Sequence, residues 1–300
     1  MTDTGLPASG PHGLKEPLLP PRLVARLERL QLGTRRRLAG GLTGDHRSPR
    51  HGSSLDFSDY REYNPGDDLR RIDQHAFARL DKLLLKLFEA EDDITVRILI
   101  DTSASMQGEK LHRAKQLAAA IGFVSLTRRD IVTIHTFPAK GPSPRLLGRS
   151  AIGQLFSLLE RLEARGETPF STAVNALLNQ TGPPGITIVL SDLLTIEWEQ
   201  GVRQLPARRG DLAVVQILDR TDIHPDMLGD LELVDAESGA RVEVSLSAKV
   251  VEDYATMATA WIDEVANRVR STGGGYVRVF TDENLEDVLL AAGRAEGVLR

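Results

Sequence analysis

The sequence predicts an α/β fold with a mostly parallel sheet, helices on both of its faces, an amino-terminal extension and an inserted β-hairpin. Three observations support this: short apolar segments, helix-length segments with an apolar face between them, and acidic residues directly after several apolar segments. Segments 94–100, 131–137 and 186–190 are largely apolar, as strands are when helices cover both faces of a sheet. Strands that alternate with helices along the chain favour a parallel arrangement.

The remaining elements continue this alternation. In segment 109–126, apolar side chains recur at helical spacing, namely at Leu111, Ala114, Ala118, Ile121 and Val124. We expect further helices over 22–32, from an N-cap at Ser150 to about residue 162, after Thr168-Pro169, over 248–270 and over 284–293, and further strands over 212–218 and 276–280. Segments 231–235 and 241–245 flank a turn and predict the β-hairpin.

Length and composition limit the class of protein. The chain has 300 residues, a net charge of −5 and no cysteine, which excludes a disulfide scaffold, thiolate zinc sites and cysteine catalysis. Neither a signal peptide nor an apolar stretch of about 20 residues is visible, so we expect a cytoplasmic protein without membrane insertion. We expect a disordered tail with a short helix over 1–33, an extension packed on the main domain over 34–91, and the main domain over 92–300.

An arginine-rich segment precedes the predicted main domain. Residues 21–50 carry eight arginines against Glu28 and Asp45, a balance that can mark a phosphate-binding arm. The alternative is a solvated loop, or a loop folded against the acidic cluster of Glu89, Glu91 and residues 92–93. The aromatic residues that stack on bases are missing from the segment, which favours the alternative.

Oxygen-bearing side chains follow the predicted strands. Asp101 ends the strand over 94–100, Ser103 and Ser105 come next, Thr168 precedes a predicted helix, and Asp192 follows the strand over 186–190. In a doubly wound sheet such junctions gather at the carboxyl edge, where ligands bind. Hard oxygen ligands suit Mg²⁺ or Mn²⁺. Each residue taken alone also fits a structural role: Ser103 and Thr168 as helix caps, and Asp101 as an anion near helix amino termini.

The Asp101-Thr-Ser-Ala-Ser105 turn, with the distant Thr168 and Asp192, resembles the metal-ion-dependent adhesion site of the von Willebrand factor A domain. The resemblance implies that Ser103, Ser105 and Thr168 ligate Mg²⁺ directly, whereas Asp101 and Asp192 act largely through bound water. It also implies an open coordination position. A Glu or Asp from another protein would fill that position.

A second, narrower resemblance rests on the segment before this motif. It contains Gly52-Ser-Ser-Leu-Asp-Phe-Ser-Asp-Tyr60, Arg61-Glu-Tyr-Asn-Pro-Gly-Asp-Asp68, Leu69-Arg-Arg-Ile-Asp73 and Leu84-Leu-Lys-Leu-Phe-Glu-Ala-Glu91. Together with the Asp-Ala-Glu-Ser-Gly hairpin and the Tyr-Val-Arg-Val strand, it resembles the bacterial family known as domain of unknown function fifty-eight, over roughly residues 34–295. Gln74, where the family has Trp, and Pro169-Phe170, where it has Asp-Leu, depart from the pattern. We interpret residues 65–68 as a turn with a buried Arg–Asp network.

The family resemblance implies a partner, a MoxR-type AAA+ ATPase, in assembling or activating other protein complexes. We therefore expect a non-enzymatic, metal-dependent interaction adaptor that presents Mg²⁺ to an acidic residue of that ATPase or its client. The alternatives are a nucleic-acid-binding protein that uses segment 22–50, or a metal-dependent hydrolase. A hydrolase needs a general base, and Glu109 and Glu167 are the carboxylates close in sequence to the proposed ligands. The phosphate-binding loop, Gly-x-Ser-x-Gly and His-Glu-x-x-His motifs are missing.

Overall fold

A computed structural model describes residues 17–28, 55–63, 67, 72–90, 94–137, 143–166, 170–179, 185–207, 210–235 and 239–289. The chain forms two compact units, one of residues 38–94 and the other of residues 1–37 with 95–300. The chain passes from the small unit into the main part of the large unit between Ile94 and Thr95. The packing of the extension on the main domain stays a prediction, as does the disorder expected for most of residues 1–33.

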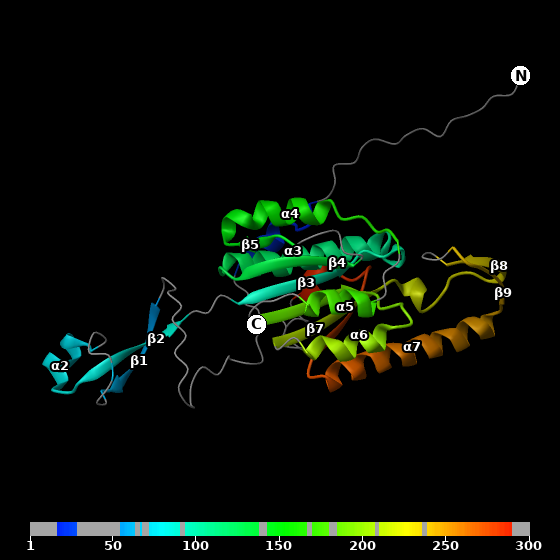
Figure 1. The fold of residues 1–300 in the computed structure, drawn as a ribbon. Coiled ribbons are helices and arrows are strands. Elements are labelled where there is room, and N and C mark those ends of the chain that lie inside the picture. The colour runs from blue at the N-terminus through cyan, green and yellow to red at the C-terminus, as the bar shows by residue number, and fades with distance from the viewer. Residues whose placement is uncertain are drawn as a thin grey trace, which may run out of the picture. The chain divides into compact units, whose positions relative to one another are not determined.

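The large unit is built on a six-stranded sheet, which confirms the predicted mostly parallel α/β arrangement (Figure 1). Its strands are β3 (Thr95–Asp101), β4 (Ile131–Phe137), β5 (Arg145–Leu147), β6 (Gly185–Ser191), β7 (Gly210–Leu218) and β10 (Gly275–Phe280). Their order across the sheet is β10-β7-β6-β3-β4-β5. All neighbouring strands run parallel except β5, which pairs antiparallel with β4.

Helices cover both faces of this sheet, as predicted (Figure 1). The helices are α1 (Pro21–Leu27), α3 (Glu109–Thr127), α4 (Ile152–Glu160), α5 (Phe170–Leu178), α6 (Trp198–Gln204), α7 (Ala248–Ser271) and α8 (Leu285–Asp287). Helices α3 and α4 lie on one face, and α5, α6 and α7 lie on the other. Strand β3 is buried along its whole length between the two layers, which explains its continuous apolar sequence.

The order of the strands creates a switch point in the middle of the sheet. The chain moves from β3 outward to β4 and β5, and then returns across β3 to form β6, β7 and β10 on the other side. Strands β3 and β6 are therefore neighbours whose connections leave in opposite directions. Ligand crevices of open α/β sheets lie outside the carboxyl ends of such a strand pair. Asp101 and Ser191 end these two strands.

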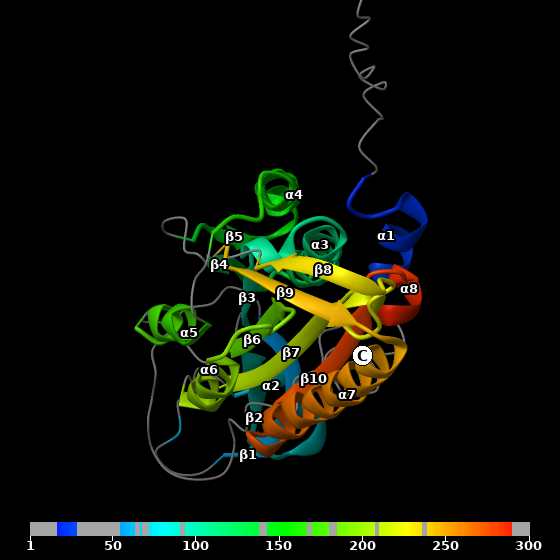
Figure 2. The ribbon, with the colours of Figure 1, turned by 90° about the vertical axis from the view of Figure 1, so that its right-hand side faces the viewer.

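The predicted hairpin is present between β7 and α7. Strands β8 (Gly229–Val234) and β9 (Arg241–Leu246) pair antiparallel, with Leu231 opposite Val244. The short helix η5 (Arg220–Asp222) connects β7 to this hairpin. Figure 2 shows β8 and β9 in front of the carboxyl edge of the main sheet.

The small unit contains β1 (Leu55–Glu62), α2 (Gln74–Leu80) and β2 (Leu84–Ala90), with β1 and β2 antiparallel. Asp73 caps α2 through the backbone N–H groups of His75 and Ala76, and it accepts a hydrogen bond from the hydroxyl of Tyr60. Among the described residues around this turn, Arg61 Nη2 lies 2.8 Å from Asp67 Oδ1 in a partly exposed ion pair. Residues 64–66 and 68–71 lie outside the described residues, so the buried Arg–Asp network stays a prediction.

Several elements differ from the sequence-based expectation. Ser150 is not an N-cap: it lies inside the short helix η3 (Arg149–Ala151), and Ala151 occupies the cap position of α4 without a side-chain bond. Among the described residues, the last predicted helix comprises α8 and the two residues after it, since 290–293 lie outside them. The short elements β5 (three residues) and α6 (seven residues) have no counterpart among the predicted elements, and neither do the strands and helix of the extension.

Candidate functional site

The turn after β3 is organised around the carboxylate of Asp101. One carboxylate oxygen, Oδ1, accepts the backbone N–H of Ser103 at 2.9 Å, and the other, Oδ2, accepts the hydroxyl of Ser191 at 2.6 Å. Asp101 is 4% exposed. The bond from Ser191 links the ends of β3 and β6, the two strands of the switch point. Asp101 therefore fixes the shape of the turn and holds it against the neighbouring strand.

The two serines of this turn bring their hydroxyl oxygens together. Ser103 Oγ and Ser105 Oγ lie 3.0 Å apart. This is a hydrogen-bond distance, and it is also about the separation of two adjacent ligands in an octahedral Mg²⁺ site, whose bonds are about 2.0–2.1 Å long. The hydroxyl pair therefore fits both a structural hydrogen bond and the predicted pair of metal ligands.

Backbone bonds join this turn to the loop that precedes α5. Thr102 accepts the N–H of Arg165 at 2.8 Å through its carbonyl, and the N–H of Ala104 donates to the carbonyl of Gly166 at 2.9 Å. Thr168, the third predicted hydroxyl ligand, lies outside the described residues. The described loop residues directly before it are thus hydrogen-bonded to the serine turn.

The second predicted carboxylate follows β6 in a tight turn. Asp192 is 1% exposed, and its Oδ1 accepts the N–H of Leu194 at 3.1 Å. Between them, Leu193 is fully buried with a φ of 59°, in the left-handed region that costs a non-glycine residue about 1 kcal/mol. The N–H of Leu193 donates to Ser191 Oγ at 2.9 Å. The turn thus holds a strained residue beside Asp192, as is common where a functional side chain must be aimed.

Two further side chains, which sequence analysis did not single out, hold Asp192. Lys110 Nζ lies 2.9 Å from Asp192 Oδ2, and the side-chain amide of Gln216 donates to the carbonyl of Asp192 at 2.9 Å. Gln216 in turn accepts the hydroxyl of Tyr276 at 2.6 Å. Burial raises the pKa of Tyr276 to about 12, so its hydroxyl keeps the proton that it donates. Asp192 is therefore fixed through both its side chain and its backbone.

The carboxyl of Asp101 has a perturbed pKa. Burial, and next the negative charge of Asp192, raise the pKa of Asp101 to about 7, although the hydrogen bonds from Ser103 and Ser191 act in the opposite direction. A buried carboxylate with a raised pKa near a second carboxylate is a candidate functional group. A divalent cation between these groups would favour their ionised forms.

The site is not a carboxylate cage. No group of three or more His, Asp or Glu residues that could hold a metal occurs among the residues that the structure describes. Two hydroxyls and two carboxylates of the predicted five residues lie at the carboxyl ends of the neighbouring strands β3 and β6. Such oxygen donors suit a hard cation that keeps part of its water. Lys110, Ser191 and Gln216 were missed because their polarity alone gives no sign of contacts with residues far away in the chain.

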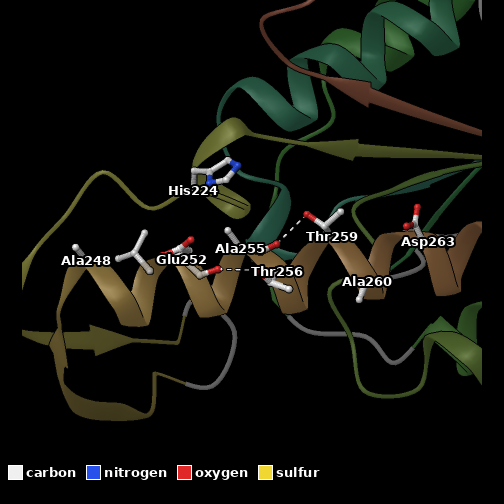
Figure 3. Close-up of a pocket in the computed structure, with 9 residues that line it drawn as sticks. His224, Ala248, Glu252, Ala255, Thr256, Thr259, Ala260 and Asp263 are labelled. Atoms are coloured by element: carbon white, nitrogen blue, oxygen red, sulfur yellow. Dashed lines mark hydrogen bonds between the residues drawn. The ribbon is translucent and has the colours of Figure 1, made fainter.

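A separate hollow lies along α7 (Figure 3). It has a volume of about 670 Å³, and apart from His224 its lining comes from one face of α7, including Glu252, Thr256 and Asp263. None of the predicted site residues lines it. Polar and small apolar side chains alternate along its wall, and the polar ones belong to successive turns of one helix rather than to two neighbouring strand ends.

Fold and site together define the class: a mostly parallel α/β protein with a buried polar cluster at the switch point of its sheet. The model of the family described as "Protein of unknown function DUF58" matches residues 59–262. The chain belongs to this family, and the resemblance noted from the sequence is thereby confirmed at the level of the family.

The curated relatives are mycobacterial. Uncharacterized protein Rv1480 of Mycobacterium tuberculosis and uncharacterized protein Mb1516 of Mycobacterium bovis are each 29% identical over 316 residues, covering 100% of this chain and 99% of theirs. Uncharacterized protein MAV169 of Mycobacterium avium is 32% identical over 115 residues, covering 38% of this chain and 68% of its own.

Two solved structures align with the large part of the chain. The conserved hypothetical protein BatB from Bacteroides thetaiotaomicron aligns with a TM-score of 0.40 at 16% identity, covering 68% of this chain and 98% of its own. An aerotolerance-related membrane protein from Bacteroides fragilis aligns with a TM-score of 0.42 at 16% identity, covering 68% and 96%. Among the described residues, no helix is both long and apolar enough to span a bilayer.

Proposed function

We propose that this protein is a non-enzymatic interaction adaptor with a von Willebrand factor A-like main domain. In this proposal Asp101, Ser103, Ser105, Thr168 and Asp192 form a site for Mg²⁺ or Mn²⁺, which the protein presents to an acidic residue of a partner. The observation that carries the proposal is the pair of hydroxyls 3.0 Å apart, beside two buried carboxylates, at the switch point of the sheet.

The chain's own groups divide the work. Ser103 and Ser105 offer neutral oxygens, while Asp101 and Asp192 have hydrogen-bonded carboxylates that orient the metal and its water. A divalent cation held by neutral hydroxyls keeps much of its charge and attracts an additional carboxylate. Binding by such a site depends on metal and is selective for an acidic side chain.

The family resemblance supplies the expected partner, a MoxR-type AAA+ ATPase or its client in the cytoplasm. We propose that the adaptor assists this ATPase in assembling or activating protein complexes. The metal would then act as the contact point between the two proteins.

Affinity capture from the bacterium that encodes the chain tests this proposal. The full-length protein is used as bait in Mg²⁺ and in EDTA, beside Ser103→Ala and the control Ser157→Ala, which removes an exposed hydroxyl from α4. We expect an AAA+ ATPase or its client to be recovered only in Mg²⁺, with wild type and Ser157→Ala. The same proteins in all samples, with EDTA or without the Ser103 hydroxyl, would contradict a metal-dependent adaptor.

A further inference from the structure

A buried lysine lies between two carboxylates beside the candidate metal site. Lys110 Nζ is 2.9 Å from Asp192 Oδ2 and 3.3 Å from Asp222 Oδ2. The exposed fractions of these side chains are 7% for Lys110, 2% for Asp192 and 21% for Asp222. Lys110 belongs to the first turn of α3, directly after the serine turn, whereas Asp222 ends η5 on the way to the hairpin. One ammonium group therefore connects the predicted site to the inserted segment.

The ammonium group of Lys110 is paired on two sides. Asp192 and Asp222 each place a carboxylate oxygen within 3.3 Å of its Nζ, and the lysine side chain is 7% exposed. A charged group is tolerated in the interior only when it is paired. Lys110 thus places a positive charge in contact with one of the predicted metal residues.

Asp192 does not need Lys110 to keep its place. The N–H of Leu194 donates to its Oδ1, and Gln216 holds its backbone carbonyl. Both contacts stay when the ammonium is removed. Loss of Lys110 therefore changes the charge around Asp192 much more than its position.

We propose that Lys110 acts on the candidate metal site through Asp192 as a built-in counter-cation, which competes with the divalent ion for that carboxylate and keeps the metal affinity low. This inference rests on the proposed function. Asp101, Asp192 and Asp222 carry three negative charges when ionised, and Lys110 offsets one of them. Without Lys110, the full negative charge of the carboxylates attracts a divalent cation, and the ammonium group no longer repels it.

Asp222 gives the lysine an alternative partner. When a divalent ion attracts the carboxylate of Asp192, Lys110 keeps its contact with Asp222 and stays paired. If Asp222 is neutral, Lys110 has Asp192 as its remaining charged contact among those described, and it competes with the metal more strongly. Changes at the two residues should therefore shift the metal affinity in opposite directions.

Calorimetric titration of MgCl₂ into the full-length protein tests this inference. Wild type is compared with Lys110→Met, Lys110→Arg, Asp222→Asn and the control Lys249→Met, which removes an exposed lysine from α7. We expect Lys110→Met to bind Mg²⁺ about tenfold more tightly than wild type, and Asp222→Asn to bind several-fold more weakly. Lys110→Arg keeps the charge and should stay close to wild type, as should Lys249→Met.

Thermal unfolding in EDTA separates this role from a purely structural one. Lys110→Met should melt at a lower temperature than wild type because two carboxylates lose their partner, although its metal affinity rises. Weaker or unchanged Mg²⁺ binding by Lys110→Met, in a wild type that binds, would overturn the inference. If Lys110→Met does not fold, the Mg²⁺ affinity of Asp222→Asn is the test. An affinity of Asp222→Asn equal to that of wild type overturns the inference. A wild type that binds no Mg²⁺ refutes the proposed function itself.

Discussion

Two neighbouring regions at the carboxyl edge of the main sheet differ in the burial of their polar side chains. At the ends of β3 and β6, Asp101 and Asp192 are buried, and their carboxylate oxygens accept hydrogen bonds from identified backbone and side-chain groups. On the β8–β9 hairpin, charged side chains lie at the surface, and Leu233 and Val242 are exposed beside each other. The first region specifies one arrangement of side chains, whereas the second is held mainly by its backbone ladder.

The difference shows where polar chemistry is costly enough to imply a function. Burying a carboxylate costs desolvation free energy, whereas an ion pair at the surface keeps most of its hydration. Buried carboxylates at the switch point therefore indicate a function, such as ligand binding, that outweighs this cost. The hairpin carries Glu232 opposite Glu243, a like-charge pair that solvent screens. Substitutions in the two regions should therefore differ in size and in their dependence on pH.

Of the two substitutions that contrast these regions, the one that removes the amide supporting Asp192 should have the larger effect on stability. In Gln216→Leu the carbonyl of Asp192 and the hydroxyl of Tyr276 lose their buried partner, so we expect the free energy of unfolding to fall by about 3 kcal/mol. Urea denaturation at pH 7 measures this change. The control is Gln154→Leu on α4, an exposed position where little change is expected. A loss for Gln216→Leu no greater than for this control would show that the network adds nothing to stability.

The next effect is a dependence on pH. In the folded protein the pKa of Asp101 is raised to about 7 from a usual value of 3.8, so the folded state binds the proton more tightly than the unfolded state. In EDTA the free energy of unfolding should therefore fall as pH rises from about 4 to 7, by at most about 1.4 kcal/mol per pH unit, and level off above. Asp101→Asn lacks this titration. Parallel pH curves for the two proteins would contradict the raised pKa.

The smallest effect is expected on the hairpin. Arg241 lies 3.0 Å from Glu232, but the two side chains are 66% and 49% exposed. Exposed ion pairs add little, so Arg241→Ala should change the free energy of unfolding by less than about 0.5 kcal/mol. The same urea experiment measures it. A loss as large as that of Gln216→Leu would remove the contrast between the two regions.

The sequence predicted the parallel core well, because periodicity reports directly on burial. Strands β3, β4 and β6 read as apolar runs, and the residues expected on the buried face of α3, such as Leu111 and Ala118, are buried. The edge strand β5 was missed because three residues give no periodic signal. Ser150 was assigned as a cap from its residue type, but a short helix there makes the cap unnecessary.

The carboxylates of the candidate site could be predicted because each lies at the carboxyl end of a predicted strand. Asp101 and Asp192 follow neighbouring strands of the sheet, and topology alone brings such residues together. Lys110 belongs to a helix that the sequence predicts, but its partner Asp192 is 82 residues away, and no local pattern reports that contact. Residues that support a site through long-range contacts therefore cannot be predicted from local patterns in the sequence.

The central claim is that the switch point binds a divalent cation through its serine hydroxyls. Isothermal titration of MgCl₂ into wild type, Ser103→Ala and Ser157→Ala tests it directly. We predict saturable binding of one Mg²⁺ by wild type and Ser157→Ala, and its loss in Ser103→Ala, which keeps the backbone bond to Asp101 but lacks the ligand oxygen. No binding by wild type, or equal binding by all three proteins, would contradict the account.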